Sequence, residues 1–285
     1  MDKLLVTGCS GQLGKRLMTE LADSYNVFGI DKILGEYRSE NIQLVDIRHF
    51  GDVYRAMDGV RYVVHAAALH GIDVVSKSRN DFYETNIDGT INVLEAAVAN
   101  NVEKLIFIST TSVYGSANDN KSGKAWWLDE NAHINTSDIY AHTKYINEKM
   151  CEYYAANTAL SIIVLRSAKF YESPNYMRNI IDYSYKGVNI GDLIQAIKLS
   201  LRKNCVLYNL YNIASSTPFL SSDCEKLFYN PREVFEERLP ELYSYCKDNK
   251  IELPESIKKV ICIDKAKKEL NFYPKHTVEE IIHIC

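Results

Sequence analysis

Short, almost wholly apolar runs alternate with helical patterns along the first 166 residues, and this alternation constrains the fold most. Runs such as LIFI and IIVL are typical of strands buried on both faces. The predicted strands are Lys3–Val6, Val27–Ile30, Gln43–Val45, Tyr62–His65, Leu105–Ile108 and Ser161–Leu165. The predicted helices include Gln12–Ser24, Asp81–Asn100 and Ser137–Asn157. Strands that alternate with helices form right-handed βαβ units, so we predict an α/β protein with a Rossmann-type, doubly wound parallel sheet.

The second part of the chain is irregular. Residues 172–175 (ESPN) are predicted to form a loop. The further predicted elements are helices at Gly191–Arg202, from Pro231 to about Lys250 and from Thr277, and strands at Val206–Ile213 and Lys259–Ile263. The patterning therefore predicts one domain at 1–166 and a smaller C-terminal lobe at 167–285. Some segments of that lobe are expected to return to the Rossmann sheet.

Composition and charge exclude several classes of protein. A net charge of -4 without any Lys/Arg block argues against a nucleic-acid binder. No apolar stretch approaches the ~20 residues of a membrane helix, and a strand-like run follows Met1-Asp2 at once, so we expect no membrane anchor or signal peptide. The seven cysteines are odd in number and never spaced as C-x-x-C, which favours free thiols in the cytoplasm.

Three glycines at intervals of three follow the first predicted strand in the segment VTGCSGQLG. In a dinucleotide-binding turn, Gly8 permits a sharp turn, Gly11 lets the backbone approach a pyrophosphate, and Gly14 lets the helix pack on the strand. A helix beginning at Gln12-Leu13 would present free N–H groups to that anion. A tight structural turn has the same spacing, so this segment alone does not decide.

Acidic residues end the second and third predicted strands. Asp31 lies about twenty residues beyond the glycines, where a carboxylate accepts both ribose hydroxyls of adenosine and repels a 2′-phosphate. This favours NAD over NADP, although Lys32 offers a cation that could counter a phosphate. Asp46-Ile47 forms a polar–apolar pair suited to the edge and face of an adenine. Asp46 could instead cap a helix near His49.

Tyr140 and Lys144 lie four residues apart, hence on the same face of the predicted helix. A free tyrosine has a pKa of ~10, and a nearby cation, from lysine or an oxidised nicotinamide, favours its phenolate. The pair is common by chance, but it co-occurs with the hydroxyl-rich stretch STTSVYG, which begins at Ser109 at the end of a predicted strand. Ligands bind beyond the carboxyl ends of such strands, so these hydroxyls can reach a reacting oxygen.

With these motifs, the sequence resembles the extended short-chain dehydrogenase/reductase family, the NAD-dependent epimerase/dehydratases. The C-terminal stretch ICIDKAKKELNFYPKHTVEEII is similar to that of the family as well. The matching motifs, in the family's order, are G-x-x-G-x-x-G at Gly8–Gly14, Asp31, Asp46-Ile47, His65-Ala66-Ala67-Ala68, Asn86, S-T-x-x-V-Y-G from Ser109, and Tyr140-x-x-x-Lys144.

The resemblance implies a mechanism. Tyr140 is the implied acid/base, Lys144 its partner, and Thr110 the hydroxyl that binds the substrate oxygen. Tyr140 would take a sugar hydroxyl proton while hydride moves to the nicotinamide, and hydride return to the other face of the ketone would complete an epimerisation. Implied cofactor contacts besides the glycines and acidic residues are Gln12, Leu13, Lys32, Ala66, Ala67, Ala68, Asn86, Ser109, Tyr140, Lys144 and Ala168.

The sequence departs from the family's pattern at two places. Family dehydratases carry Asp-Glu after the threonine, where this chain has Thr111 and Ser112, so water elimination is disfavoured. Lys169 replaces an asparagine that touches the substrate diphosphate in family members. Lys169, with Arg178 and Lys186, could grip an anion instead, or the latter two could be solvated surface cations.

Four further residues have two readings each. His70 faces the substrate, or it is a solvated loop residue. Trp126 and Trp127 form an apolar wall over a ligand, or they anchor a loop. Cys9 is a reactive thiol before a helix, or a small residue that fills the turn. Thr111 is a further candidate substrate contact, and no residues have metal-ligand spacing.

We therefore predict an NAD-dependent epimerase that acts on a sugar or nucleotide sugar. Its NAD-binding Rossmann domain, at 1–166, would carry the catalytic Tyr/Lys helix, and the residues at 167–285, shortened relative to the family, would form mainly a small substrate lobe. The alternatives are a dehydrogenase or ketoreductase for a smaller polar substrate, and a dinucleotide-sensing or scaffold protein without turnover. The predicted helix Asp81–Asn100 is apolar over an unusually wide arc, which fits a homodimer interface and also a merely well-buried helix.

Overall fold

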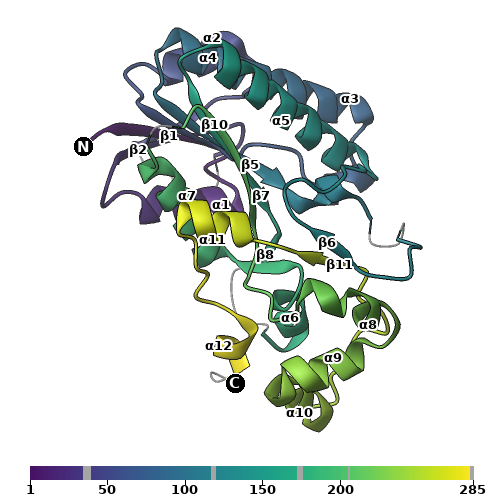
Figure 1. Ribbon diagram of the computed structural model, residues 1–285. Coiled ribbons are helices and arrows are strands. Elements are labelled where there is room, and N and C mark those ends of the chain that lie inside the picture. Colours follow the sequence, from purple (N-terminus) through teal and green to yellow (C-terminus); the bar gives the residue numbers. More distant parts are fainter. Residues whose placement is uncertain (35–39, 117–119, 172–175, 205, 283–285) are drawn as a thin grey trace. The chain divides into compact units, whose positions relative to one another are not determined.

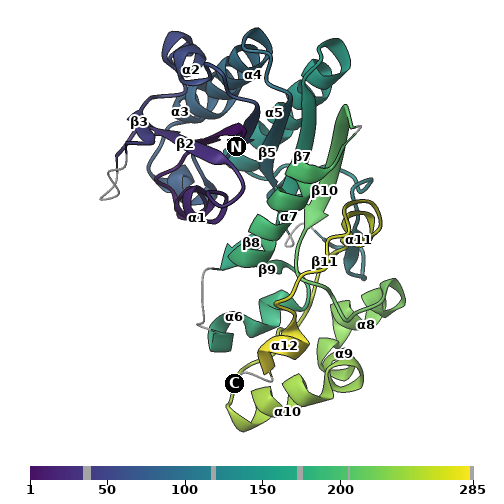
Figure 2. The same cartoon turned by 90° about the vertical axis from the view of Figure 1, so that its left-hand side faces the viewer.

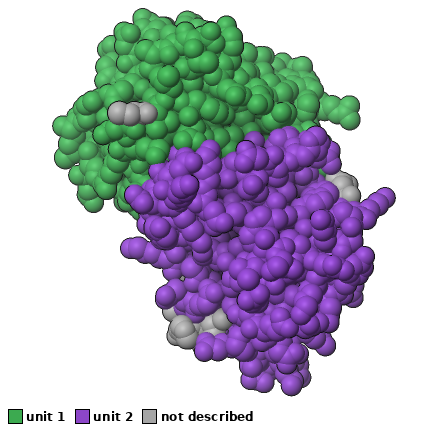
Figure 3. All heavy atoms as spheres, in the orientation of Figure 1, with its two compact units in different colours: residues 1–113, 136–165, 197–210 green, residues 114–135, 166–196, 211–285 purple. Residues whose placement is uncertain are grey.

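The computed structural model divides the chain into two compact units. It describes residues 1–285 except 35–39, 117–119, 172–175, 205 and 283–285, so the predicted loop at 172–175 lies outside the described residues. Unit 1 contains Met1–Val113, Thr136–Leu165 and Ile197–Leu210, and unit 2 contains the remainder (Figure 3). Residues 114–135 therefore cluster with unit 2, although they fall inside the range predicted for the Rossmann domain.

The central sheet has seven strands in the order β10-β7-β5-β4-β1-β2-β3 (Figure 1). β1 pairs in parallel with β2 and β4, and β5 pairs in parallel with β4. The strand bounds are β1 Lys3–Thr7, β2 Asn26–Asp31, β3 Ile42–Leu44, β4 Tyr62–His65, β5 Lys104–Thr110, β7 Ser161–Ser167 and β10 Tyr208–Ile213. All seven residues of β5 are buried, as its apolar run predicts. The predicted Rossmann-type α/β fold is thus confirmed.

Helices cover both faces of the sheet in unit 1. Figures 1 and 2 show α2, α4 and α5 on one face and α1 on the other. Their bounds are α1 Gln12–Glu20, α2 Phe50–Ala56, α3 Arg79–Phe82, α4 Gly89–Ala99 and α5 Ile139–Asn157. The core between sheet and helices includes Leu5, Val63, Val93, Phe107 and Val164. This packing holds the carboxyl ends of the strands in a fixed arrangement.

The predicted helix Asp81–Asn100 is interrupted. Between α3 and α4 the backbone forms a π-helical turn over Tyr83–Asp88. Such turns are rare in proteins, and those that occur often lie at functional sites. On α4, Val93, Leu94, Ala96 and Ala97 are buried, and the helix packs against α2 as well as α5. Part of its wide apolar arc is thus used within the chain, while Ile87 and Ile91 stay partly exposed.

Unit 2 is built on two small parallel strand pairs, β6 with β11 and β8 with β9. Its strands are β6 Trp126–Leu128, β8 Lys169–Tyr171, β9 Gly187–Asn189 and β11 Lys259–Ile261. Its helices are α6 Tyr176–Tyr183, α8 Cys224–Tyr229, α9 Pro231–Arg238, α10 Pro240–Asp248, α11 Asp264–Leu270 and α12 Val278–Ile282, and α7 Ile190–Arg202 begins in this unit. Phe219, Leu227, Phe235, Leu242 and Val260 form part of its core.

Two expectations about unit 2 are wrong. The single helix predicted from Pro231 to Lys250 is two helices, because Pro240 lacks an N–H and starts α10 as its first residue. Trp126 and Trp127 do not lie in a loop but in β6, whose partner β11 is more than a hundred residues away in sequence.

The described cysteines are free thiols in buried positions. Cys9 is 1% exposed, and burial raises its pKa to about 11, so the structure supports the space-filling reading over the reactive one. Within the described ranges, none of the helices combines the length and apolar character that crossing a bilayer requires. Nor does the described part of the chain group three or more His, Cys, Asp or Glu side chains in a way that could hold a metal ion.

Candidate active site

The glycine turn leaves no room for side chains at two of its three positions. Gly8 has a φ of +74°, and a Cβ there would lie 2.8 Å from the Ala67 backbone. A Cβ on Gly14 would lie 2.1 Å from the Gly8 carbonyl oxygen, so this glycine permits close helix–strand packing. Gly11 is exposed and meets only the Gly8 oxygen, at 3.3 Å. It caps α1 without a side-chain hydrogen bond, and the exposed Gln12 and buried Leu13 begin the helix. This arrangement fits a pyrophosphate, because backbone can approach at Gly11 and the first-turn N–H groups have no side-chain cap.

Asp31 ends β2 beside this turn. Its Oδ2 accepts the Ser10 N–H at 2.9 Å, and its Oδ1 accepts the Ile33 N–H at 3.1 Å. Each carboxylate oxygen has two lone-pair sites, so both can still accept a ribose hydroxyl. Lys32 is exposed. The donor and acceptor set around the turn therefore fits the adenosine half of NAD.

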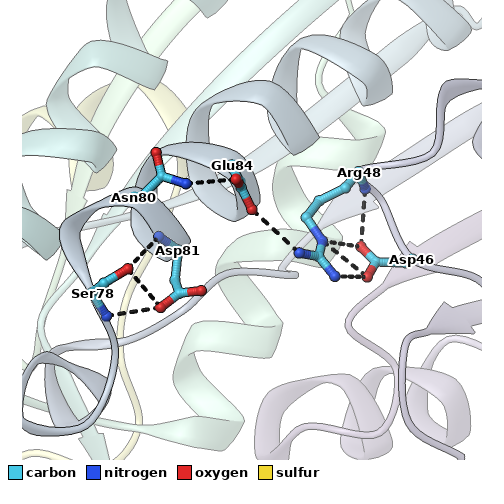
Figure 4. A network of polar contacts seen from close by, with 6 residues as sticks. All are labelled: Asp46, Arg48, Ser78, Asn80, Asp81 and Glu84. Carbon is cyan, nitrogen blue, oxygen red and sulfur yellow. Dashed lines mark hydrogen bonds and ion pairs between the residues drawn. The ribbon is translucent and has the colours of Figure 1, made fainter.

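Asp46 is engaged by Arg48, as Figure 4 shows. The guanidinium donates to both carboxylate oxygens at 2.6–3.1 Å, and the Arg48 N–H adds a bond of 3.0 Å. These bonds lower the pKa of Asp46. Asp46 does not cap α2, whose N-cap is His49. Ile47 is 5% exposed, and its side chain lies where a Cβ on Gly89 would be, so it serves the core.

Arg48 also reaches across to the π-helical turn. Its Nη1 lies 3.5 Å from Glu84, which accepts a 2.6 Å bond from Asn80 (Figure 4). In the same view, Ser78 and Asp81 cap α3 reciprocally. These exposed contacts tie the end of β3 to the segment that carries Asn86.

The alanines after β4 lie against the glycine turn. Ala66, Ala67 and Ala68 are partly exposed, and Thr7 Oγ1 accepts the Ala67 N–H at 3.2 Å. Asn86 is 1% exposed, and its side chain bonds to Leu69 N, Leu69 O and Thr143 Oγ1 at 2.7–3.1 Å. The alanines thus form a small-residue strip beside the turn, while Asn86 clamps the strip's end to α5.

Tyr140, Lys144 and Thr110 come together in unit 1. Asp138 caps α5 by accepting the Ala141 N–H at 2.8 Å, which places Tyr140 in the first turn and Lys144 one turn later. Thr110 ends β5, where its hydroxyl donates to Ser112 Oγ at 3.1 Å and lies close enough to the Tyr140 phenol to lower the pKa of that group. Tyr140 is partly exposed and Lys144 is 3% exposed.

Burial dominates the electrostatics of this trio. It raises the pKa of Tyr140 to about 12, with a smaller rise from Asp138 and an opposing effect of the Thr110 hydroxyl. It lowers the pKa of Lys144 to about 8. The Lys144 ammonium lies 4.1 Å from the centroid of the Phe107 ring and makes no hydrogen bond to the described residues. A lysine whose side chain is almost wholly buried, and whose ammonium makes no hydrogen bond to the described residues, fits a site that receives a polar group from a ligand.

The other predicted hydroxyl and imidazole contacts differ in accessibility. Ser109 is 3% exposed, and its hydroxyl donates to Glu148 at 2.6 Å, so it faces inward. Thr111 is 8% exposed. The exposed His70 lies beside Tyr140 with ring centroids 6.0 Å apart. The pKa of His70 is lowered, chiefly because part of its ring is removed from water and secondly by the charge of Lys144. The charge of Asp73 opposes this effect.

The remaining predicted residues lie in unit 2. Ala168 is 2% exposed, with its N–H bonded to the Ile213 carbonyl, whereas Lys169 is exposed above the Tyr171 ring. Lys186 forms an ion pair of 3.1 Å with Asp182. The side chain of Arg178 lies outside the described residues. Trp126 and Trp127 are partly exposed and line a cavity of about 470 Å³ within unit 2.

Comparison with known proteins now identifies the family. The model of the NAD dependent epimerase/dehydratase family matches residues 4–191. The chain belongs to this family. Among curated members, the N-acetyl-alpha-D-glucosaminyl-diphospho-ditrans,octacis-undecaprenol 4-epimerase of Escherichia coli O157:H7 is 28% identical over 229 residues, covering 74% of this chain and 66% of that protein.

Other similar proteins include a dehydrogenase and a solved structure. The L-arabinose 1-dehydrogenase (NAD(P)(+)) of Haloferax volcanii is 31% identical over 173 residues, covering 58% of this chain and 66% of that protein. The chain thus spans slightly less than two thirds of the length of both curated proteins. MoeE5 in complex with UDP-glucuronic acid and NAD shares the fold, with a TM-score of 0.72 at 19% identity, covering 99% of this chain and 96% of that chain.

In this epimerase/dehydratase chain, sequence reasoning missed the inward face of α5. Thr143, Asn147 and Glu148 are buried on the same helix as Lys144. Their positions three, seven and eight residues after Tyr140 repeat the helical period, so a face analysis anchored on Tyr140 would have found them.

Proposed function

We propose that this chain is an NAD-dependent enzyme that epimerises a sugar or nucleotide sugar through Tyr140. The observation that carries the proposal is that the Tyr140 phenol lies close to the Thr110 hydroxyl at the end of β5. Lys144 lies one helical turn after Tyr140. The E. coli O157:H7 relative is a 4-epimerase of an N-acetylglucosaminyl-diphospho-undecaprenol, which supports the reaction type.

The residues proposed to hold the cofactor are those of the glycine turn, Asp31 and the alanine strip. The first-turn N–H groups of α1 would bind the pyrophosphate, and Asp31 the adenosine ribose. Lys144 would donate to the nicotinamide ribose. Asp46 and Ile47 would act indirectly, because Arg48 holds the Asp46 carboxylate and Ile47 packs in the core. NAD bound in this way supplies a hydride acceptor and donor at its nicotinamide.

The protein's own part in the reaction is to move one proton. Thr110 would hold the substrate oxygen, and Tyr140 would take its proton as the carbinol is oxidised and return it as the ketone is reduced. Because burial holds the pKa of Tyr140 near 12, the phenolate needs positive charge close by, and Lys144 carries such a charge below its pKa of about 8. His70, Thr111 and, from unit 2, Lys169 are the proposed substrate contacts.

The second candidate function is net oxidation or reduction of a sugar. The similarity to the L-arabinose 1-dehydrogenase favours it, and Thr111 and Ser112 provide no second carboxylate that would point to another chemistry. An epimerase regenerates its cofactor in each cycle, whereas a dehydrogenase accumulates one NADH per sugar oxidised.

The deciding experiment is a screen of nucleotide sugars, free sugars and small ketones with NAD, with NADP in a parallel arm. NADH absorbance and product NMR are read on each mixture. We expect one sugar to be inverted at a single carbon without net NADH, and faster with NAD than with NADP. Stoichiometric NADH would establish the second candidate. Failure to bind either dinucleotide would refute the proposal as a whole.

We also propose a cytoplasmic homodimer that uses the outer faces of α4 and α5. The partly exposed Ile87 and Ile91 and the 64% exposed Tyr153 support this assembly. Light scattering on purified protein would test it, and a monomer mass at micromolar concentration would refute it.

A further inference from the structure

Six buried polar residues form a continuous hydrogen-bonded path through unit 1, linked by side chains except at the Asn86 main-chain carbonyl, and we call this path the buried polar chain. None of the six is more than 1% exposed. Its members, in order, are Thr7, His65, Thr90, Asn147, Asn86 and Thr143. The path begins one residue before Gly8 and ends one residue before Lys144. It therefore joins the glycine turn to the helix that carries Tyr140 and Lys144.

The first half of the chain runs through His65. Thr7 Oγ1 lies 2.6 Å from His65 Nδ1, and His65 Nε2 lies 3.0 Å from Thr90 Oγ1. Burial, then the charge of Lys144, lower the pKa of His65 to about 3. The imidazole is thus neutral at neutral pH, and one ring nitrogen donates while the other accepts.

The second half runs through the π-helical turn. Asn86 bonds to both backbone groups of Leu69 and to Thr143 Oγ1, and Thr143 in turn donates to the Tyr140 carbonyl at 2.9 Å. This half therefore fixes the end of the alanine strip and the first turn of α5 against each other.

Asn147 is the junction of the two halves. Its Nδ2 donates to Thr90 Oγ1 at 3.1 Å and to the main-chain carbonyl oxygen of Asn86 at 2.7 Å. Asn86 lies within the π-helical turn. Its Oδ1 is buried without a hydrogen-bond partner among the described residues. An amide that leaves one end unsatisfied in the interior carries a cost. What the Asn147 side chain contributes to the structure is therefore the two hydrogen bonds that its Nδ2 donates.

We propose that Asn147 is a positioning residue that holds the π-helical turn against α5 and thereby sets where Lys144 stands relative to the alanine strip and the glycine turn. The proposal rests on the proposed function, in which Lys144 and the turn serve one cofactor. Lys144 makes no hydrogen bond of its own to the described residues, so its position depends on the placement of its helix.

The test compares Asn147→Leu with Asn92→Leu. Asn92 is a matched control, because its Nδ2 also donates to a backbone carbonyl, that of Ile47 at 3.0 Å, but lies outside the buried polar chain. Amide hydrogen exchange is measured on the full chain without cofactor. We expect residues 83–90 to exchange about tenfold faster in Asn147→Leu, since a lost anchor permits local opening, and at the wild-type rate in Asn92→Leu.

Two further readouts separate positioning from plain stability. The Lys144 ammonium is titrated by NMR of labelled lysine, and NAD affinity is measured by calorimetry. In Asn147→Leu we expect the Lys144 midpoint to move from about 8 toward the ordinary value of about 10.4, and the NAD dissociation constant to rise about five- to tenfold. If Asn147→Leu does not fold, Asn147→Ser carries the same measurements and should fall between it and wild type.

Unchanged exchange at residues 83–90 together with an unchanged Lys144 midpoint would overturn the proposal. Equal shifts in Asn92→Leu would also overturn it, because the effect would then be general destabilisation. Wild-type protein that binds no NAD would instead refute the proposed function, so the two failures are distinguishable.

Discussion

The candidate residues in unit 1 and those in unit 2 are held in different ways. In unit 1, Asn86 and Lys144 are almost fully buried and lie in or beside the buried polar chain. In unit 2, Lys169 is exposed and Lys186 is paired with Asp182 at the surface. The residues proposed for cofactor binding and the redox step are thus positioned by the core, whereas Lys169, the substrate contact proposed in unit 2, has an exposed side chain. Changes in unit 1 should affect folding, cofactor and rate, and changes in unit 2 should affect substrate affinity alone.

The largest effect is expected from Tyr140→Phe. Loss of a positioned acid/base lowers rates by about 10²- to 10⁴-fold, while NAD affinity should stay within a factor of about two, because the ring remains. The turnover rate is measured with the substrate found in the screen, and NAD affinity is measured by calorimetric titration. Activity near the wild-type level would remove Tyr140 from the mechanism and with it the contrast between the two units.

A pair of glycine substitutions separates packing from cofactor binding. A Cβ at Gly14 would meet backbone atoms at 2.1 and 2.7 Å, which cannot move aside, so Gly14→Ala should lower the free energy of unfolding by about 2–3 kcal/mol. Gly11 has a φ of -73°, and a Cβ there would meet only the Gly8 oxygen, at 3.3 Å, so Gly11→Ala should lose much less stability than Gly14→Ala and should weaken NAD binding. Urea unfolding and NAD titration of both variants give the result. Equal losses of stability would contradict this division.

His65 makes stability depend on pH. Its pKa is lowered in the folded protein to about 3 from the ordinary 6.5, so the unfolded chain binds a proton more readily as pH falls. Its contribution is fully present above pH 6.5 and is lost on acidification toward pH 3, by at most about 1.4 kcal/mol per pH unit. Urea unfolding at several pH values, with His65→Gln as reference, isolates this slope. A slope identical in both proteins would contradict this, because His65 would then take up its proton as readily in the folded protein as in the unfolded chain.

The smallest effect is expected from Lys169→Met. An exposed cation that contacts an anionic group on the substrate contributes up to about 1 kcal/mol, so KM should rise about fivefold or less with kcat unchanged. The matched variant Lys186→Met removes a cation that Asp182 already pairs, and it should change KM less. A fall in kcat or in thermal stability with Lys169→Met would mean that unit 2 positions its residues as firmly as unit 1.

Local patterns predicted much of unit 1. The strands and the glycine turn follow from apolar runs and from spacings within about ten residues, and the structure places β4 at the predicted Tyr62–His65. Tyr140 and Lys144 share a helix face because their spacing of four needs no tertiary information. Pro240 was readable as well, since a proline in a helix interior marks a boundary.

Long-range contacts account for most of the rest. The interruption of the predicted helix at Tyr83–Asp88 is accompanied by the bond between Asn86 and Asn147, residues 61 positions apart. The strand β6 exists through pairing with β11 across more than a hundred residues. The pairing of Arg48 with Asp46 is local, two residues apart, and was missed for a different reason: a ligand hydroxyl and a neighbouring guanidinium satisfy the same carboxylate.

The backbone at Gly115 lies against that at Asn135. A Cβ on Gly115, whose φ is +91°, would lie 2.2 Å from the Asn135 carbonyl oxygen. The two ends of the segment between Gly115 and Asn135 therefore lie against each other. The entropy cost of closing such a segment rises only slowly with its length. Residues inserted at the exposed positions 121 and 122 of this segment, outside the paired strand β6, should therefore cost little free energy of unfolding, provided that glycine remains at position 115.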